Sequence, residues 1–286
     1  MNAPTVELFC DGGPEIGYGH IRRTLTLSET LRKHGTLVRV SGISKYASSL
    51  LPPQPALAKP ASVVVLDAPY GIDQKIHCAR ELGQRVVALD WFGDCEPDVA
   101  IAIFPHKEVR ARMRSYIGFD YQMIRTDIID QPRNIDGEGV LIVLGGGDKL
   151  GQGPSSARQL SAMGFNVTLI QGPLCPSQAH SEHYEILTNP NDLPVRLAMS
   201  GWVVTNGGGC MFEAMYLGKP IVVLPQTEAE NSIAKHALAR RALLGVGLES
   251  FKKYDRESLW HTGRSASVLI DGQGAKRVAE IVGALL

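Results

Sequence analysis

A glycine-rich segment near the start of the chain ends in a histidine that could serve as a base. The segment runs Asp11-Gly12-Gly13-Pro14-Glu15-Ile16-Gly17-Tyr18-Gly19-His20. Its glycines allow backbone angles closed to other residues, so a ligand can approach the main chain closely. Because the segment leads into a predicted helix, its free N–H groups favour an anion and disfavour a protonated imidazole. We predict that neutral His20 accepts a proton during catalysis; capping or packing of the helix is the alternative.

A second glycine-rich segment, Thr205-Asn206-Gly207-Gly208-Gly209-Cys210-Met211-Phe212-Glu213-Ala214, also joins a predicted strand to a predicted helix. Bare amides at such a turn suit a pyrophosphate. Glu213 falls early in the helix, where a carboxylate could accept hydrogen bonds from a ribose diol. Compensation of the helix dipole is the alternative role of that acid. We expect polar contacts from Gln226-Thr-Glu-Ala-Glu-Asn231 and from the turn Gly145-Gly146-Gly147-Asp148, which opens the second half of the chain.

Other polar residues follow predicted strands but admit two interpretations. Asp67 and Asp90 each end a strand, where acids act in catalysis but also cap turns. His180 and His183 are three residues apart, and without a third ligand nearby we interpret them as a surface pair rather than a metal site. The first loop is neither a dinucleotide fingerprint, because Arg22 replaces the third glycine, nor a Walker A loop.

Short apolar runs that alternate with helical stretches must position these loops. In the first half, strands are predicted at 6–10, 37–40, 62–66, 85–89 and 99–103, with helices at 20–33 and 72–82. In the second half, strands are predicted at 140–144, 167–170, 202–205 and 221–224. Helices are predicted at 152–163, after the turn 206–209 as far as 217, and at 229–243. The polar segment 131–139 breaks the alternation and is interpreted as a linker. Continuous apolar strands separated by helices are typical of parallel sheets. The pattern predicts two doubly wound α/β domains, 1–134 and 135–286, that face each other across a cleft; the last helix could pack back on the first domain.

Composition narrows the class of protein. The 286 residues include 29 Lys+Arg and 29 Asp+Glu, a balance that argues against a partner such as nucleic acid or a membrane surface. The sequence has neither an apolar run of about 18 residues nor a signal peptide at its start. The 5 cysteines are scattered and form no C-x-x-C pair. We therefore expect a reduced cytoplasmic protein without a zinc site, another metal or a bound cofactor.

Three parts of the chain, in the same order, resemble the PseG family, which hydrolyses UDP-2,4-diacetamido-2,4,6-trideoxy-β-L-altropyranose in pseudaminic acid biosynthesis. The first part resembles its D-x-G-x-x-I-G-x-G-H-x-x-R signature and spans Asp11 to Arg23. The second is Leu144-Gly-Gly-Gly-Asp148, and the third spans Gly207 to Pro220 and is shared with the related MurG family. The chain departs from the family pattern at Cys210, where a hydroxyl residue is usual, and at Ser232, which replaces Gln.

The resemblance implies a GT-B fold with two Rossmann-like domains. It implies that water attacks the anomeric carbon of a UDP-linked amino-deoxy sugar, with inversion and release of UDP. It places His20, as the base, and Asp11 among the catalytic residues. The expected substrate contacts are Gly12, Gly17, Tyr18, Gly19, Arg23, Asp67, Tyr70, Gly146, Gly207, Gly208, Gly209, Cys210, Glu213, Glu230 and Asn231. Two alternatives remain: a MurG-like UDP-sugar glycosyltransferase, and a UDP-sugar-binding protein without catalysis.

Overall fold

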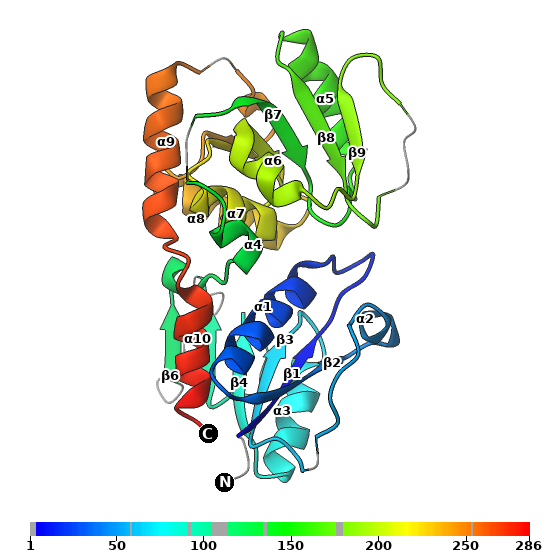
Figure 1. Ribbon diagram of the computed structural model, residues 1–286, viewed down its shortest axis with the longest axis vertical. Helices are drawn as coiled ribbons and strands as arrows, with labels where there is room; N and C mark the ends of the chain where they lie inside the picture. The colour runs from blue at the N-terminus through cyan, green and yellow to red at the C-terminus, as the bar shows by residue number, and fades with distance from the viewer. Residues whose placement is uncertain are drawn as a thin grey trace. The chain divides into compact units, whose positions relative to one another are not determined.

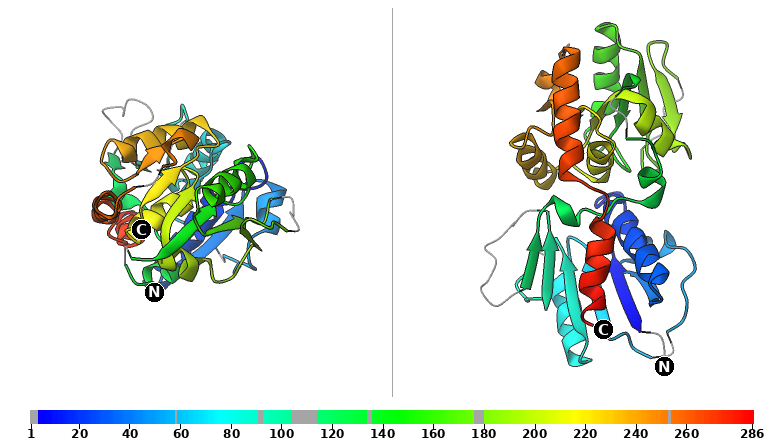
Figure 2. Two further views of the ribbon diagram at one scale, coloured as in Figure 1. Left: turned by 90° about the horizontal axis from the view of Figure 1, so that it is seen from above. Right: turned by 60° about the vertical axis from the view of Figure 1, so that its left-hand side comes forward.

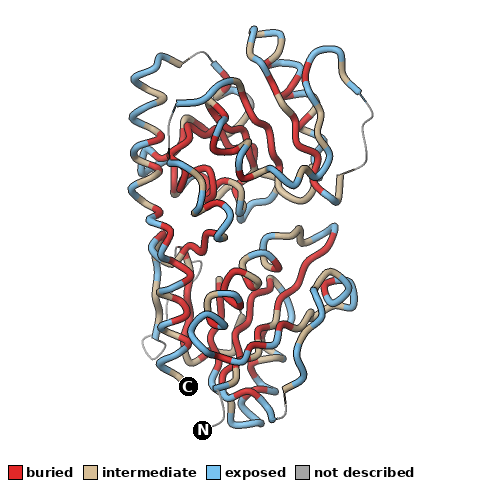
Figure 3. Tube along the Cα trace, viewed as in Figure 1, coloured by how far each residue is buried: buried red, intermediate tan, exposed pale blue. Residues whose placement is uncertain are grey.

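The structure, a computed structural model, contains two compact units. It describes residues 4–57, 59–90, 93–103, 114–133, 136–175, 180–252 and 254–286. Unit 1 comprises Met1–Arg125 together with Gly272–Leu286, and unit 2 comprises Thr126–Asp271. Each unit is a parallel sheet with helices packed on it (Figures 1 and 2). The buried residues follow the strands within each unit (Figure 3).

Unit 1 has a six-stranded sheet with the order β2-β1-β3-β4-β5-β6, and every neighbouring pair is parallel. The strands are β1 (Thr5–Cys10), β2 (Leu37–Gly42), β3 (Val63–Asp67), β4 (Arg85–Leu89), β5 (Val99–Ala102) and β6 (Arg114–Ile117). The chain leaves β1 toward β2 on one side and later returns to β3 on the other. The direction in which successive strands are added therefore reverses between β1 and β3. Ligands of open α/β sheets bind at the carboxyl ends of the strands at such a point.

The helices of unit 1 cover both faces of this sheet. They are α1 (Gly19–Lys33), α2 (Lys45–Ser49), α3 (Ile72–Glu81) and α10 (Gly274–Gly283), with the 3-10 turn η1 (Phe119–Tyr121). Apolar side chains of α1 and α10 share one core with β1, and those of α3 share a second core with β3 and β4. Since α10 packs on α1 and η1, the last part of the chain belongs to unit 1.

Unit 2 has a second six-stranded parallel sheet with the order β12-β11-β10-β7-β8-β9. The strands are β7 (Glu138–Val143), β8 (Val167–Gln171), β9 (Glu185–Thr188), β10 (Ser200–Thr205), β11 (Ile221–Val223) and β12 (Gly245–Val246). Numbered from the start of the unit and read from β9, this is the order 3-2-1-4-5-6 of a dinucleotide-type sheet, which reverses between β7 and β10.

The described residues of unit 2 include the helices α4 (Thr126–Ile129), α5 (Gln152–Ala162), α6 (Leu193–Met199), α7 (Gly209–Tyr216), α8 (Glu228–Leu238) and α9 (Arg256–Leu269), with the 3-10 turn η2 (Leu248–Ser250). Trp202 on β10 anchors the core by edge-to-face contacts, with centroids 5.3 Å from Phe165 and 6.4 Å from Phe251. Across the described ranges, no helix combines the length and apolar character that crossing a bilayer requires.

The predicted α/β architecture is confirmed, with differences at particular elements. β4 has the predicted bounds, and β3 extends one residue further, so that Asp67 is part of the strand. The sequence pattern did not predict α2, β6, α4, β9, α6, β12 and α9. The units divide at Arg125 rather than at residue 134, because α4 packs on α6 of unit 2. Residues 134–135 of the predicted linker lie outside the described residues.

Candidate functional site

Asp11 shapes the glycine-rich loop between β1 and α1. Its side chain is 7% exposed, and Oδ1 accepts hydrogen bonds from the Gly12 amide at 2.9 Å and from Ser44 Oγ at 2.6 Å. Ser44 in turn caps α2 by accepting a bond from the Ala47 amide at 3.0 Å. We expected the Asp11 carboxylate to act in catalysis. Its hydrogen bonds hold the loop and the start of α2, and these bonds support a positioning role.

The rest of this loop is a tight turn before α1. Gly13 and Gly17 exchange backbone hydrogen bonds of 3.1 Å and 2.6 Å, and Gly17 has a φ of 86°, a conformation that favours glycine. A Cβ on Gly12 would lie 2.5 Å from the Ile21 side chain, so the helix could not pack this closely on a larger residue. Tyr18 is the N-cap residue of α1, and Gly19 and His20 form its first turn.

His20 lies beside a buried carboxylate at the point where the sheet of unit 1 reverses. Its Nδ1 is 2.6 Å from Oδ1 of Asp67, the last residue of β3. The imidazole is 25% exposed, whereas Asp67 is 1% exposed. An ionised carboxylate only accepts hydrogen bonds, so the ring proton of a neutral imidazole belongs on Nδ1. Nε2 then keeps its lone pair, which is the arrangement that a general base requires.

Arg23, one turn after His20 on α1, completes the cluster. Its Nε and Nη2 donate to the two oxygens of Asp67 at 2.8 Å and 2.5 Å, and Nη1 donates to Asp90 Oδ2. Thr24 Oγ1 adds a bond of 3.3 Å to Asp67. Arg23 and Asp67, both expected to contact substrate, are thus bonded to each other and to neighbouring protein groups beside His20.

The charges of Asp67 and Arg23 stabilise each other's ionised form. Burial alone would raise the pKa of Asp67, but the guanidinium of Arg23 and the contact with His20 outweigh it and hold the pKa well below its usual range. Burial alone would lower the pKa of Arg23, yet Asp67 and Asp90 hold it above the usual range. Asp67 therefore stays ionised and Arg23 stays protonated at any pH near neutrality. Tyr70, three residues beyond Asp67, is 73% exposed and so free to meet a ligand.

In unit 2, the turn between β10 and α7 presents backbone amides at the reversal of the second sheet. Gly208 is the N-cap residue of α7 and provides no side chain, and Gly209 is the first helical residue. A Cβ on Gly207 would lie 2.4 Å from the carbonyl oxygen of Glu230, so only glycine fits there. A Cβ on Gly209 would meet nothing within 4 Å. The open amino end of α7 is suited to an anion.

Glu230 and its hydrogen-bond partners connect three loops of unit 2. One carboxylate oxygen accepts from Asn206 Nδ2 at 2.6 Å, and the other accepts from the Gln226 amide at 2.8 Å. The Gln226 side chain then bonds Leu144 O at 3.3 Å and the Lys149 amide at 2.6 Å. Glu230 was expected to contact substrate; the structure engages both its oxygens in fixing the loops after β7, β10 and β11.

The other expected contacts of unit 2 differ in exposure. Glu213 is 8% exposed on α7, and Cys210 is partly exposed one turn earlier. Asn231 Nδ2 lies 3.4 Å from Glu228 within α8. The carbonyl of Gly146 accepts from the Leu174 amide at 2.8 Å, so this glycine braces the loop after β8.

Sequence reasoning overlooked Asn206, Gln226 and Ser44 as side chains that fix the loops, and it left the role of Asp90 open. Asn206 and Asp90 each directly follow a strand of a parallel sheet, and this position could have indicated a role in the site. Their hydrogen-bond partners could not be predicted, because these partners lie on other loops or helices. His180 and His183 are both exposed, and no group of three or more His, Cys, Asp or Glu within the described part of the chain could hold a metal ion.

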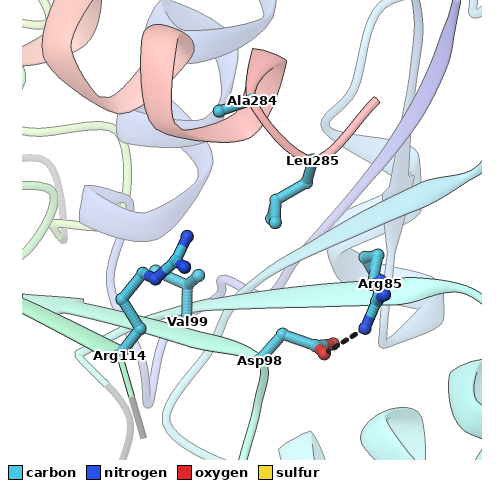
Figure 4. A pocket seen from close by; sticks show the side chains of 6 residues that line it. All are labelled: Arg85, Asp98, Val99, Arg114, Ala284 and Leu285. Atoms are coloured by element: carbon cyan, nitrogen blue, oxygen red, sulfur yellow. Dashed lines mark hydrogen bonds and ion pairs between the residues drawn. The ribbon is translucent and has the colours of Figure 1, made fainter.

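A cavity of about 390 Å³ in unit 1 lies away from this site (Figure 4). It is lined by Arg85, Asp98, Val99, Arg114, Ala284 and Leu285. Arg85, Val99 and Arg114 are the first residues of their strands, so the cavity is at the amino ends, opposite to His20. An ion pair of 3.1 Å joins Arg85 to Asp98.

Two curated proteins are similar in sequence to this chain. The uncharacterized protein MJ1062 of Methanocaldococcus jannaschii is 21% identical over 79% of the chain, which spans about 56% of that protein's length. The spore coat polysaccharide biosynthesis protein SpsG of Bacillus subtilis is 22% identical, with 97% of each chain covered. No protein-family model matches the chain.

Solved structures establish the fold. MurG of Acinetobacter baumannii matches with a TM-score of 0.70 and 13% identity, over 98% of this chain and 99% of that one. MnaA of S. aureus, solved with UDP, matches with a TM-score of 0.61 and 10% identity, over 99% and 98% of the two chains. With its two parallel sheets, the chain has the GT-B fold that the sequence predicted.

Proposed function

We propose that this chain hydrolyses a UDP-linked amino-deoxy sugar, with His20 as the base that activates water. The observation that carries the proposal is the 2.6 Å contact between His20 Nδ1 and the buried Asp67, which leaves Nε2 able to accept a proton. The resemblance of the glycine-rich loop to the PseG signature supports the choice of water as nucleophile. The involvement of SpsG in polysaccharide biosynthesis supports a nucleotide-sugar substrate.

In the proposed reaction, water forms a bond to the anomeric carbon while the bond from that carbon to the β-phosphate oxygen breaks. The bonding electrons leave with UDP, and a proton of the water passes to His20 Nε2. Attack opposite to the leaving group inverts the anomeric centre. Negative charge develops on the leaving pyrophosphate. Within unit 2 alone, the amide-lined start of α7 at Gly208 and Gly209 is suited to bind an anion such as a pyrophosphate.

A matched pair of histidine variants tests the proposal. The purified chain is incubated with a panel of UDP-linked N-acetylated amino sugars, without an acceptor, and UDP release is followed. His20→Gln should lower kcat by about 10²–10⁴-fold, the usual share of a general base. His34→Gln, at the opposite end of α1, should leave the rate unchanged, because the exposed imidazole of His34 bonds only the Thr30 carbonyl among the side-chain contacts described. Equal rates for wild type and His20→Gln would contradict the proposal.

A UDP-sugar glycosyltransferase is the second candidate, and the similarity to MurG in fold favours it. The same imidazole would then deprotonate a hydroxyl of an acceptor instead of water. Release of UDP only after an alcohol acceptor is added would favour this candidate over hydrolysis. Binding of UDP without either activity would indicate a nucleotide-sugar-binding protein.

A further inference from the structure

Arg23 makes more polar contacts than a purely structural arginine needs. It grips both oxygens of Asp67 with two nitrogens, at 2.8 Å and 2.5 Å, in the bidentate geometry that fixes a carboxylate plane. The same Nη2 lies 3.4 Å from His20 Nδ1; since Nδ1 carries the ring proton, these two donors do not bond each other, and both donate to Oδ1 of Asp67. The third nitrogen, Nη1, is bonded to Asp90. The guanidinium is 16% exposed, so little water screens these charges.

Asp90 is held in an unusual backbone conformation that presents its carboxylate to Arg23. It follows β4 directly and has a φ of 47°, in the left-handed region that few residues other than glycine adopt. Its amide donates to the Ile101 carbonyl at 2.8 Å, which fixes the end of β4 against β5. A strained residue at the carboxyl end of a strand beside a candidate catalytic group indicates a functional constraint.

The balance of charge explains why an arginine is needed beside this histidine. Two carboxylates, Asp67 and Asp90, lie in the cluster with Arg23, and the Cys10 thiol is nearby, with its pKa raised by burial and by Asp67. Without Arg23, no other cation of the cluster among the described residues would offset the charge of the buried Asp67, and that charge favours an imidazolium beside it. An imidazolium donates from both nitrogens and cannot act as a base.

We propose that Arg23 is a positioning residue that orients and charge-compensates Asp67, so that His20 carries its proton on Nδ1 and presents an unprotonated Nε2. Asp90 holds Arg23 in that position. The identity of the nucleophile that meets Nε2 rests on the proposed function, whereas the state of the ring does not.

Nitrogen NMR of the ligand-free protein tests this directly. Two-bond proton–nitrogen correlation spectra of the ¹⁵N-histidine-labelled protein are recorded at pH 7.5, and the His20 signals are assigned with His20→Gln. Wild type should show an unprotonated Nε2 and a protonated Nδ1. Arg23→Gln should move the Nε2 signal to the protonated range, or to a mixture of tautomers. Arg85→Gln breaks the ion pair at the other end of β4 (Figure 4) and should leave the His20 signals unchanged.

Two results would overturn the inference. One is a wild-type ring with its proton on Nε2, and the other is a folded Arg23→Gln variant whose His20 signals match wild type. If Arg23→Gln does not fold, Asp90→Gly serves instead, because glycine adopts the positive φ and the change removes the anchor while it keeps the guanidinium; unchanged His20 signals there would equally refute the role. Arg23→Lys, which keeps the charge, should restore the wild-type ring state. Because no substrate is used, failure of UDP-sugar hydrolysis leaves this test intact.

With a substrate in hand, kinetics give a second readout. Asp90→Gly should lower kcat for UDP release by about tenfold and change KM less than twofold, since Asp90 acts on the base rather than on substrate binding. A rise in KM at constant kcat would instead indicate a role in binding and would contradict the inference.

Discussion

Replacing Asp67 by asparagine should disable His20 with little change in shape. The carboxylate accepts bonds from His20 Nδ1, from two nitrogens of Arg23 and from Thr24 Oγ1. An asparagine offers one acceptor oxygen and one NH₂ donor. If the NH₂ faces His20, it donates to Nδ1 and moves the ring proton to Nε2. If the NH₂ faces Arg23, two donor groups lie against each other, and the hydrogen bond from Arg23 is lost.

The first orientation places the ring proton on the wrong nitrogen, and the second loosens the group that orients the ring, so the expected loss in kcat is large. The wrong tautomer in a comparable acid–histidine pair costs about 10⁴-fold, and we expect about 10³–10⁴-fold here. This corresponds to about 4–5 kcal/mol of transition-state stabilisation. The expected loss of folding stability is smaller, about 1–3 kcal/mol, because Arg23 keeps Asp90 as a counter-ion.

The assay is kcat for UDP release, with urea unfolding as the measure of stability. Asp98→Asn is the matched control, because Asp98 pairs with Arg85 at the opposite end of the sheet, and it should keep wild-type activity. An Asp67→Asn variant that keeps more than a tenth of wild-type kcat would refute the reasoning, since its base would not depend on the carboxylate.

The acid dependence of stability checks the same carboxylate. The pKa of Asp67 in the folded chain lies well below its value in an unfolded chain, about 3.9. Its ion pairs therefore contribute full stability above that pH and lose it as the pH falls toward the folded value. The difference in unfolding free energy between wild type and Asp67→Asn should be constant from pH 5 to 7 and shrink below about pH 4.

Three further changes test other parts of the structure. Gly207→Ala should lower the unfolding free energy by about 2–4 kcal/mol, because its Cβ would overlap the Glu230 carbonyl, whereas Gly209→Ala should be neutral; urea unfolding of both decides. Glu230→Gln should weaken UDP binding about tenfold by calorimetry and leave the His20 NMR signals unchanged, since it loosens only the loops of unit 2. Burial lowers the pKa of Lys219 from 10.5 to about 8. The unfolded chain thus binds more protons between those values, and stability should rise by about 3 kcal/mol from pH 8 to 10.5. Lys219→Met should abolish that rise in a urea series.

The sequence predicted the fold class because its strands are continuous apolar runs. Val86 and Val87 in β4 and Val203 and Val204 in β10 are fully buried, as expected for sheets covered on both faces. Shorter or more polar elements escaped prediction. β6 contains an exposed arginine and partly buried residues, and its identity as a strand depends on pairing with β5 rather than on its own pattern.

The candidate site was predictable loop by loop but not as a network. His20 could be singled out from its loop, and Asp67 from its place after an apolar run. Their contact depends on the direct pairing of β3 with β1, in which Cys10 is the register partner of Asp67. The order of strands in a sheet cannot be predicted from local periodicity. For the same reason, the bond between Asn206 and Glu230 was not foreseen, because it joins loops that become neighbours only in the folded sheet.

The most direct test of the account is hydrolysis in ¹⁸O-labelled water. Wild-type protein and His20→Gln are incubated with UDP-2,4-diacetamido-2,4,6-trideoxy-β-L-altropyranose, and both products are analysed by mass spectrometry. The account predicts label in the anomeric hydroxyl of the free sugar, unlabelled UDP, and loss of both products in His20→Gln. Label in UDP, or equal turnover by the variant, would contradict attack at the anomeric carbon by water that His20 activates.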